Sequence, residues 1–265
     1  MSNLTSRPPG TSVIAECLRL HSSTPARSAV GRFFGSRPMS NDTRSWFDGA
    51  LGEQTVGSHL KRLGLEWAVF HAVPVGKGES DIDHVVIGPG GVFTINTKHH
   101  RGKKIWLGSG RILVNGQKRD HLRNSRHEAQ RAGKLLTARL GRTVPVTPVL
   151  ALVGIDSITV KQRPTDVVVL RDTELVKWLK RRTTVLGPEA VEAARSVASD
   201  VTTWHTEHDG SFDSTLFARF DDLRREDSTA RTRRILWGSV LAIAAILAVW
   251  GLGNVVLKAA LATLA

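Results

Sequence analysis

Cysteine is almost absent from this sequence. Cys17 is the only one among 265 residues, so the chain cannot form an internal disulfide bond and has no set of thiolates for a zinc site. The lone cysteine is consistent with a reducing compartment. Aromatic residues are also scarce, at 6% of the chain, so no row of rings stands out on which the bases of a single-stranded nucleic acid would stack.

Motifs of several enzyme classes are missing as well. The segment GKGES (76–80) is similar to a phosphate-binding loop, but His71 stands where the first glycine belongs, and Gly78 follows Lys77 in place of Ser or Thr. The chain has no G-x-S-x-G sequence, which argues against a serine hydrolase of the α/β type. The expected elements do not alternate regularly between strand and helix, so a doubly wound dinucleotide-binding fold is disfavoured.

Acidic residues are outnumbered. The 37 Lys and Arg residues against 24 Asp and Glu residues give a formal net charge of +13. Such a balance favours nucleic acid or an anionic membrane surface as partner. Within the part expected to fold, basic residues are densest in KHHRGKK (98–104) and KRDHLRNSRH (118–127).

An uncharged run near the C-terminus is the strongest single signal. Residues 235–257 (ILWGSVLAIAAILAVWGLGNVVL) carry no charge. A helix of this length would extend about 34 Å at ~1.5 Å per residue, which exceeds the hydrocarbon core of a bilayer. Trp237 and Trp250 would lie towards the two interfaces. The run therefore predicts a single transmembrane helix.

The charges beside this run predict its orientation. Only Lys258 follows it, whereas a cluster of arginines precedes it: Arg224, Arg225, Arg231, Arg233 and Arg234. By the positive-inside rule the preceding part stays on the cytoplasmic side and the short tail, 258–265, crosses the membrane. The arginine cluster would also contact anionic head groups. We expect a tail-anchored protein whose soluble domain is cytoplasmic.

The remaining chain divides by composition. Residues 1–43 are rich in Ser, Pro, Gly and Arg, which predicts a disordered tail, although this composition also resembles a transit peptide. Residues 206–234 are charged and predict a linker. Residues 44–205 hold a helix, three to five strands, a helix, two strands and two more helices. This order predicts an α/β domain with a mixed central β-sheet flanked by helices.

The segment SDIDHVVIGPGGVFTINTKHH (80–100) reads as a hairpin that turns at Pro89-Gly90. Because alternate residues of a strand share a face, Asn96 and Lys98 project together, and antiparallel pairing brings Asp83 close to Lys98. Glu53 on the first helix could lean over the same point. Carboxylates with water and substrate phosphate are what Mg²⁺ prefers, so a metal-dependent phosphodiesterase site is one interpretation.

Each of these residues also has a plainer interpretation. An exposed ion pair of Asp83 and Lys98 would contribute less than ~1 kcal/mol. Glu53 would complement the helix dipole, and His84, on the face opposite Asp83, would be a packed, hydrogen-bonded residue. The residues that follow the hairpin could contact phosphates: His99, His100, Arg101, Lys103 and Lys104.

A family resemblance favours the site. The segments GEQTVGSHLKRL (52–63) and SDIDHVVIGPGGVFTINTKHHRG (80–102) are followed by a hairpin with Trp106 and a helix with Gln130. In this order they resemble the nuclease-related domain (NERD) family of the PD-(D/E)xK restriction-endonuclease-like superfamily. The resemblance is close over residues 47–140 and looser to Trp204.

The resemblance assigns roles residue by residue. It makes Asp83 the metal-binding aspartate, Lys98 the catalytic lysine, Glu53 the helix carboxylate and Gln130 the helix glutamine that follows the hairpins. Asn96 departs from the pattern, because Glu stands there in Glu-x-Lys; its amide oxygen can bind a metal but brings no charge.

Two functions follow from the resemblance. One is hydrolysis of DNA phosphodiester bonds with Mg²⁺ or Mn²⁺ held by Asp83, Glu53 and Asn96. The other is a catalytically inactive module that uses the nuclease fold to bind nucleic acid or a protein partner at the membrane.

Overall fold

The computed structural model describes residues 3–75, 81–205 and 213–262. It divides into two compact units. The first comprises Met1–Cys17 and Arg44–Leu216, and the second comprises Leu18–Thr43 and Phe217–Ala265. The loop expected at 76–80 and the first part of the expected linker, 206–212, lie outside the described residues.

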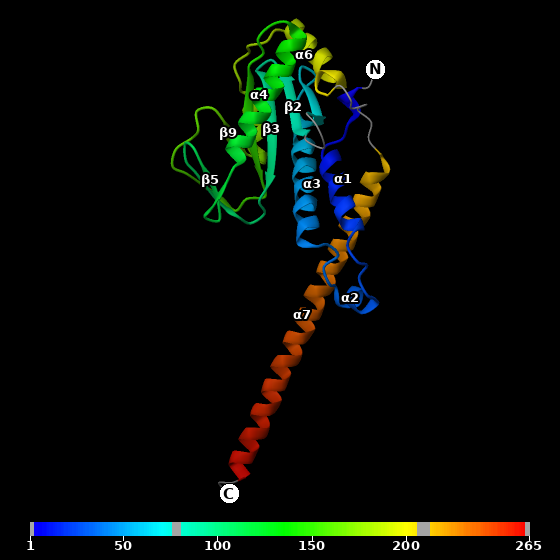
Figure 1. Ribbon diagram of the computed structural model, residues 1–265. Coiled ribbons are helices and arrows are strands. Elements are labelled where there is room, and N and C mark those ends of the chain that lie inside the picture. The colour runs from blue at the N-terminus through cyan, green and yellow to red at the C-terminus, as the bar shows by residue number, and fades with distance from the viewer. Residues whose placement is uncertain (1–2, 76–80, 206–212, 263–265) are drawn as a thin grey trace. The chain divides into compact units, whose positions relative to one another are not determined.

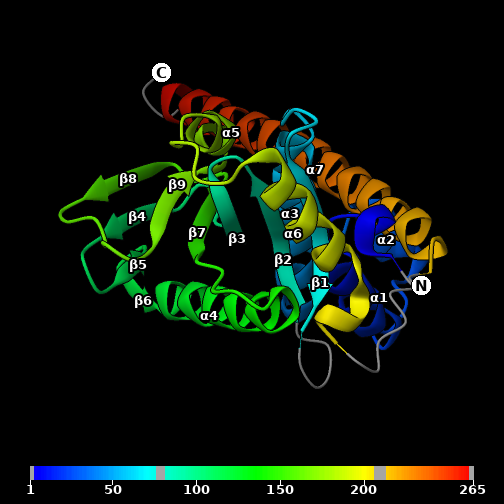
Figure 2. The ribbon, with the colours of Figure 1, turned by 90° about the horizontal axis from the view of Figure 1, so that it is seen from above.

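The first unit is built on two mixed β-sheets (Figures 1 and 2). One has the order β1-β2-β3-β7-β9, in which β1, β2 and β3 are antiparallel and β3, β7 and β9 are parallel. The other has the order β6-β5-β4-β8. The strands of the first sheet are β1 (Ala68–Pro74), β2 (Asp81–Gly88), β3 (Gly91–His99), β7 (Val146–Val153) and β9 (Val168–Arg171); those of the second are β4 (Lys104–Leu107), β5 (Ile112–Val114), β6 (Gln117–Arg119) and β8 (Ser157–Val160).

Helices cover both faces of the five-stranded sheet. The helices of this unit are α1 (Thr11–Ser22), α3 (Asn41–Leu60), α4 (His121–Leu140), α5 (Asp172–Lys180) and α6 (Pro188–Ser199), with short 3₁₀ turns η1 (Leu4–Ser6) and η2 (Val201–Thr203). On one face α4 and α6 pack against Val85 and Ile87. On the other, α3 and α5 pack against Val86, Phe93 and Ile95. Figure 2 shows α4 and α5 on opposite sides of this sheet.

The central strands are apolar because both of their faces are covered. In β2 and β3 every residue from Ile82 to Gly88 and from Val92 to Thr97 is buried. A strand in this position reads as a nearly continuous apolar run. The polar residues that interrupt the run therefore lie in a buried setting, which is the property that matters for the site.

The predicted fold class is confirmed: the domain is mixed α/β with helices on its sheets. The hairpin expected near 103–116 belongs to the second sheet, which has a core of its own with Ile105, Leu107 and Ile112. The strands β6 and β8 complete this sheet and are polar or short, with exposed residues, so the sequence carried little signal for them.

Residues 1–43 differ from the disordered tail that composition predicts. Leu4 is buried in the same core as Phe70, and Asn3 forms a β-bridge with Asp200. Within α1, Ile14 and Cys17 are fully buried. Because these apolar residues are few and lie among Ser, Pro and Arg, their spacing is hidden in the average composition, and long-range contacts order the segment instead.

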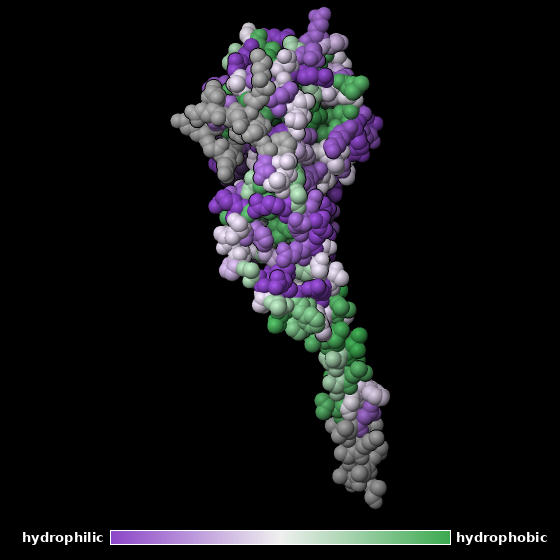
Figure 3. All heavy atoms as spheres, turned by 90° about the vertical axis from the view of Figure 1, so that its right-hand side faces the viewer, coloured by the Kyte–Doolittle hydropathy of each residue, from purple (hydrophilic) through white to green (hydrophobic). Residues whose placement is uncertain are grey.

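The second unit contains α2 (Ala29–Phe34) and most of α7 (Thr215–Ala262). Helix α7 is continuous over 48 residues, so the expected linker is helical from Thr215 onward, and the uncharged run continues the same helix. Phe33 and Phe34 contact the ring of Trp237, whose indole N–H donates to the Phe33 carbonyl. Between residues 240 and 252 the large apolar side chains of α7 are exposed (Figure 3). By length and composition Thr215–Asn254 is a candidate membrane span.

Candidate functional site

The site begins where β2 and β3 lie side by side. His84 pairs with Ile95, so Asp83 and Asn96, one residue further along, lie opposite each other. The backbone N–H of Thr97 donates to Asp83 Oδ2 at 2.6 Å. Burial raises the pKa of Asp83, while the positive charge of Lys98 and the Thr97 hydrogen bond oppose the increase. A carboxylate is thus fixed in the sheet within electrostatic reach of Lys98.

The opposite strand face carries a histidine pair. His71 Nδ1 lies 2.8 Å from His84 Nδ1, and His84 Nε2 lies 3.3 Å from Thr97 Oγ1. Burial lowers the pKa of His71 to about 4 and that of His84 well below its usual value. Both rings are therefore neutral at pH 7, and His84 has the packed, hydrogen-bonded position that strand alternation predicts.

Helix α3 brings Glu53 to the site. The helix approaches β3 closely because residue 52 is glycine: a Cβ there would lie 3.0 Å from His99 Cβ and 3.3 Å from Thr97 Cγ2. His99 Nδ1 contacts the Asp48 carbonyl at 2.8 Å and ties the two elements together. Glu53 is only 5% exposed. Burial raises its pKa well above the usual value, the charges of Asp83 and Asp81 raise it further, and Lys98 opposes them.

Glu128 on α4 is a member of this cluster that the sequence did not single out. Asn96 Nδ2 donates to Glu128 Oε1. Burial and the charge of Asp83 raise the pKa of Glu128 to about 8, against the effect of Lys98. The one available signal was that Glu128 is the single acid in the sequence of α4, HLRNSRHEAQRAGKLLTARL.

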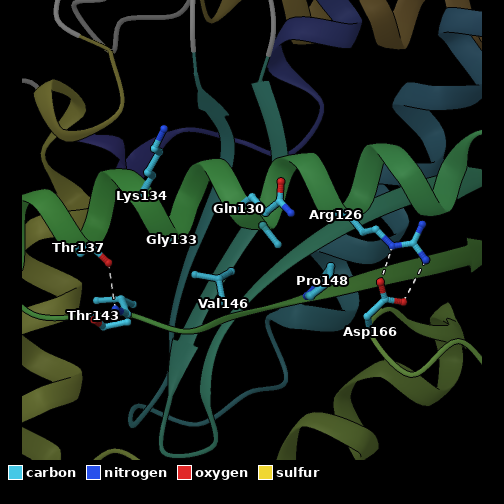
Figure 4. A pocket seen from close by; sticks show the side chains of 11 residues that line it. Arg126, Gln130, Gly133, Lys134, Thr137, Thr143, Val146, Pro148 and Asp166 are labelled. Carbon is cyan, nitrogen blue, oxygen red and sulfur yellow. Dashed lines mark hydrogen bonds and ion pairs between the residues drawn. The ribbon is translucent and has the colours of Figure 1, made fainter.

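Gln130, which the resemblance favours, lies elsewhere on α4. Its side chain lines a cavity of about 490 Å³ together with Arg126, Lys134 and Asp166, on the side of the helix near Val146 and Pro148 (Figure 4). Within this lining, Arg126 and Asp166 form a bidentate ion pair, with Nε–Oδ2 and Nη2–Oδ1 distances of 2.5 and 3.0 Å. It is Glu128, two residues earlier, that contacts Asn96.

Several oxygens of the cluster are buried and have no hydrogen-bond partner. They are Glu53 Oε2, Asp81 Oδ2, Asn96 Oδ1 and Glu128 Oε2. Burial and the charge of Asp83 raise the pKa of Asp81 to about 6, while Ser12 and Arg7 lower it. Buried oxygens are normally satisfied, and grouped carboxylates resist losing their protons together. A cation would relieve both conditions.

The donor set fits a hard divalent cation. Mg²⁺ and Mn²⁺ take oxygen ligands, and Mg²⁺ needs only one or two carboxylates beside water and phosphate. Among the described residues, no group of three or more His, Cys, Asp or Glu side chains is placed so that it could hold a metal ion.

The basic residues beyond Lys98 fall into two groups. His100 and His121 stack, with their Nε2 atoms 2.9 Å apart. Burial, and then the charge of Lys98, lowers the pKa of His100 to about 4 and that of His121 to about 3, so both are neutral at pH 7. The exposed group, which we call the basic rim, is Arg101, Lys103 and Lys104.

Comparison with known families agrees with the geometry. The family model described as nuclease-related domain (NERD) matches residues 48–153, a span that includes most of α3, the β2–β3 hairpin and α4. No curated protein and no solved structure matches the chain.

Proposed function

We propose that this chain, whose residues 48–153 match the nuclease-related domain model, is a membrane-anchored hydrolase of DNA phosphodiester bonds that uses Mg²⁺ or Mn²⁺. The observation that carries this proposal is the buried group of Asp83, Glu53 and Asn96 beside Lys98. A purely structural core would gain nothing from burying carboxylates that repel one another.

The residues divide the work as follows. Asp83 and Glu53 would hold the cation, and the amide oxygen of Asn96 would contribute a neutral ligand. A cation held there would polarise the scissile phosphate and make a coordinated water a better nucleophile. Lys98, on the same strand face as Asn96, positions the attacking water and offsets the negative charge that develops on the phosphate.

The basic rim binds the DNA substrate, and helix α7 anchors the protein in the membrane. Arg101, Lys103 and Lys104 contact the phosphates of the DNA backbone, which orients the strand without reading its sequence. Helix α7 spans the bilayer, and the arginines that precede the apolar run keep the domain on the cytoplasmic side. Anchoring confines the activity to DNA that approaches the membrane surface.

The direct test is cleavage of supercoiled plasmid by the full chain in detergent micelles. We expect nicked or linear product with Mg²⁺ or Mn²⁺ and none with EDTA. Asn96 favours a second function, a module that binds nucleic acid or a protein partner without cleaving. That function predicts salt-sensitive DNA binding, no product with either ion, and no gain of cleavage in Asn96→Glu.

The basic rim gives a prediction about DNA binding. Replacing Arg101, Lys103 and Lys104 together by Ala will weaken binding to a duplex and flatten its salt dependence. Each lost phosphate contact reduces the slope of log K against log salt concentration by about 0.9, so the triple variant should lose about 2.7. Fluorescence anisotropy with a labelled duplex in EDTA measures this slope. The matched control replaces three other exposed basic residues of the same unit, Lys161, Arg163 and Arg181, and an equal slope change in both variants would argue against a specific rim.

A further inference from the structure

Position 96 is where the proposed site lacks a charge. Asn96 is 3% exposed, lies opposite Asp83 and shares a strand face with Lys98. Its amide is oriented by the hydrogen bond from Nδ2 to Glu128 Oε1. This bond leaves Asn96 Oδ1 buried and without a partner. The side chain opposite Asp83 is therefore a neutral amide, and the Glu128 carboxylate contacts that amide through its Nδ2 atom.

Glu128 occupies a place on α4 where a polar residue is costly. Ala132 and Leu136, four and eight residues later, belong to the core that α4 forms with the sheet, and residues at this spacing lie on one helix face. Ser125 and Ala129, on adjoining positions, are buried too. Glu128 is half-buried, and its Oε2 atom is removed from water without gaining a hydrogen bond in return. Such a position is expected for a group that acts on a ligand.

We propose that Glu128 supplies the carboxylate that is missing at position 96, so that Asp83, Glu128 and the Asn96 amide oxygen together hold the divalent cation. This inference rests on the proposed function, because it concerns the same site, and it puts Glu128 in the place that Glu53 has there as the second carboxylate ligand. Two carboxylates, one amide oxygen, water and substrate phosphate meet the needs of Mg²⁺ or Mn²⁺. The Glu128 carboxylate comes from α4, whereas the Glu of the Glu-x-Lys pattern would come from β3. The hydrogen bond from Asn96 orients the Glu128 carboxylate.

A structural role for Glu128 is the competing explanation. The Asn96–Glu128 hydrogen bond joins β3 to α4. In the structural explanation, Glu128 serves only to make this connection. The two roles differ in what they need: a joint needs an acceptor oxygen, whereas a cation ligand needs the negative charge. Gln at position 128 keeps an acceptor oxygen of the same shape and removes the charge, so Glu128→Gln separates the two roles.

The experiment measures Mn²⁺ binding to the full chain in detergent, without DNA, by the loss of the free Mn²⁺ electron paramagnetic resonance signal. We expect Glu128→Gln to weaken binding by at least ~10-fold, since loss of groups around a metal commonly costs 10- to 100-fold in affinity. Glu189→Gln, at an exposed position on α6, is the matched control and should bind as the original chain does. Thermal unfolding in EDTA shows whether each variant is folded.

A charge exchange gives the second arm. In the double variant Asn96→Glu with Glu128→Gln, the amide and the carboxylate trade places and the hydrogen bond between them is retained. We expect Mn²⁺ affinity to return to within ~3-fold of the original chain, because the site regains its second charge.

The outcomes separate this inference from the proposed function. Unchanged Mn²⁺ affinity in folded Glu128→Gln would overturn the role of Glu128 and leave a site of Asp83 and Glu53 intact. A second outcome is loss of binding in Glu128→Gln without recovery in the exchanged variant. It would show that the charge is needed at position 128 and that residue 96 does not contact the cation. This result would also overturn the proposed ligand set of Asp83, Glu128 and Asn96. If the original chain binds no Mn²⁺, both this inference and the metal-dependent function fail.

Discussion

Replacing Asp83 by Asn will lower the rate of Mn²⁺-dependent plasmid cleavage by at least ~100-fold, the usual cost of losing a charge-stabilising group in an active site. Asp83 lies at the centre of the cluster: its charge raises the pKa of Glu53, Asp81 and Glu128, so it is near all three. Asn has the same shape and still accepts the hydrogen bond from Thr97 N–H. The loss would therefore report on charge alone.

The rate is to be followed as nicked product against time at saturating Mn²⁺, with the full chain in detergent. Lys98→Ala should show a loss of similar size, because in the proposed arrangement the Lys98 ammonium positions the attacking water and offsets the negative charge on the phosphate. Asp156→Asn, an exposed aspartate of the same unit, serves as control and should cleave at the original rate. Asp83→Asn with full activity would remove this cluster from consideration as the active site.

Without a cation, the free energy of unfolding of the original chain should fall with rising pH when it is measured relative to that of the Glu128→Gln variant. The pKa of Glu128 is raised from 4.5 to about 8 in the folded chain. Between these values the folded state holds a proton that the unfolded state has released, so the stabilising contribution is complete below pH ~4.5 and lost as pH passes ~8. At ~1.4 kcal/mol per pKa unit, the difference between the two proteins should change by on the order of 5 kcal/mol.

The comparison with a variant is necessary because histidines act in the opposite sense. His71, His84, His100 and His121 have lowered pKa values in the folded chain, so their contribution is lost as pH falls below ~6.5. Subtracting the Glu128→Gln curve removes this common part. Denaturant unfolding in EDTA, followed by tryptophan fluorescence from pH 4.5 to 8.5, gives both curves.

Saturating Mn²⁺ offers an internal check on the same curves. A bound cation takes the place of the proton on Glu128, so the decline in stability at high pH should disappear for the original chain and persist in EDTA. A difference curve that stays flat from pH 4.5 to 8.5 would show that Glu128 ionises freely in the folded protein, contrary to the burial of its Oε2 atom.

Local patterns in the sequence predicted the hairpin and the apolar run within α7. The Pro89-Gly90 turn fixes how β2 pairs with β3, and two-residue alternation then places Asn96 and Lys98 on one face and His84 on the other. Both effects act over a few residues and therefore leave a readable trace. The same holds for the uncharged run in α7, which needs no partner to be recognised as a candidate membrane span.

The tertiary structure decided which distant residues meet these local elements. Glu128 lies 32 residues from Asn96 in sequence, and only the way α4 packs on the sheet brings it there in place of Gln130. Gly52 likewise matters because α3 crosses Thr97 and His99 closely. Leu4 and Ile14 become buried although their segment reads as disordered. Periodicity and composition describe a residue's own surroundings along the chain, whereas these contacts depend on how separate elements pack. The strand residues of the site could therefore be predicted from the sequence, and only the packing of α4 places Glu128 beside Asn96.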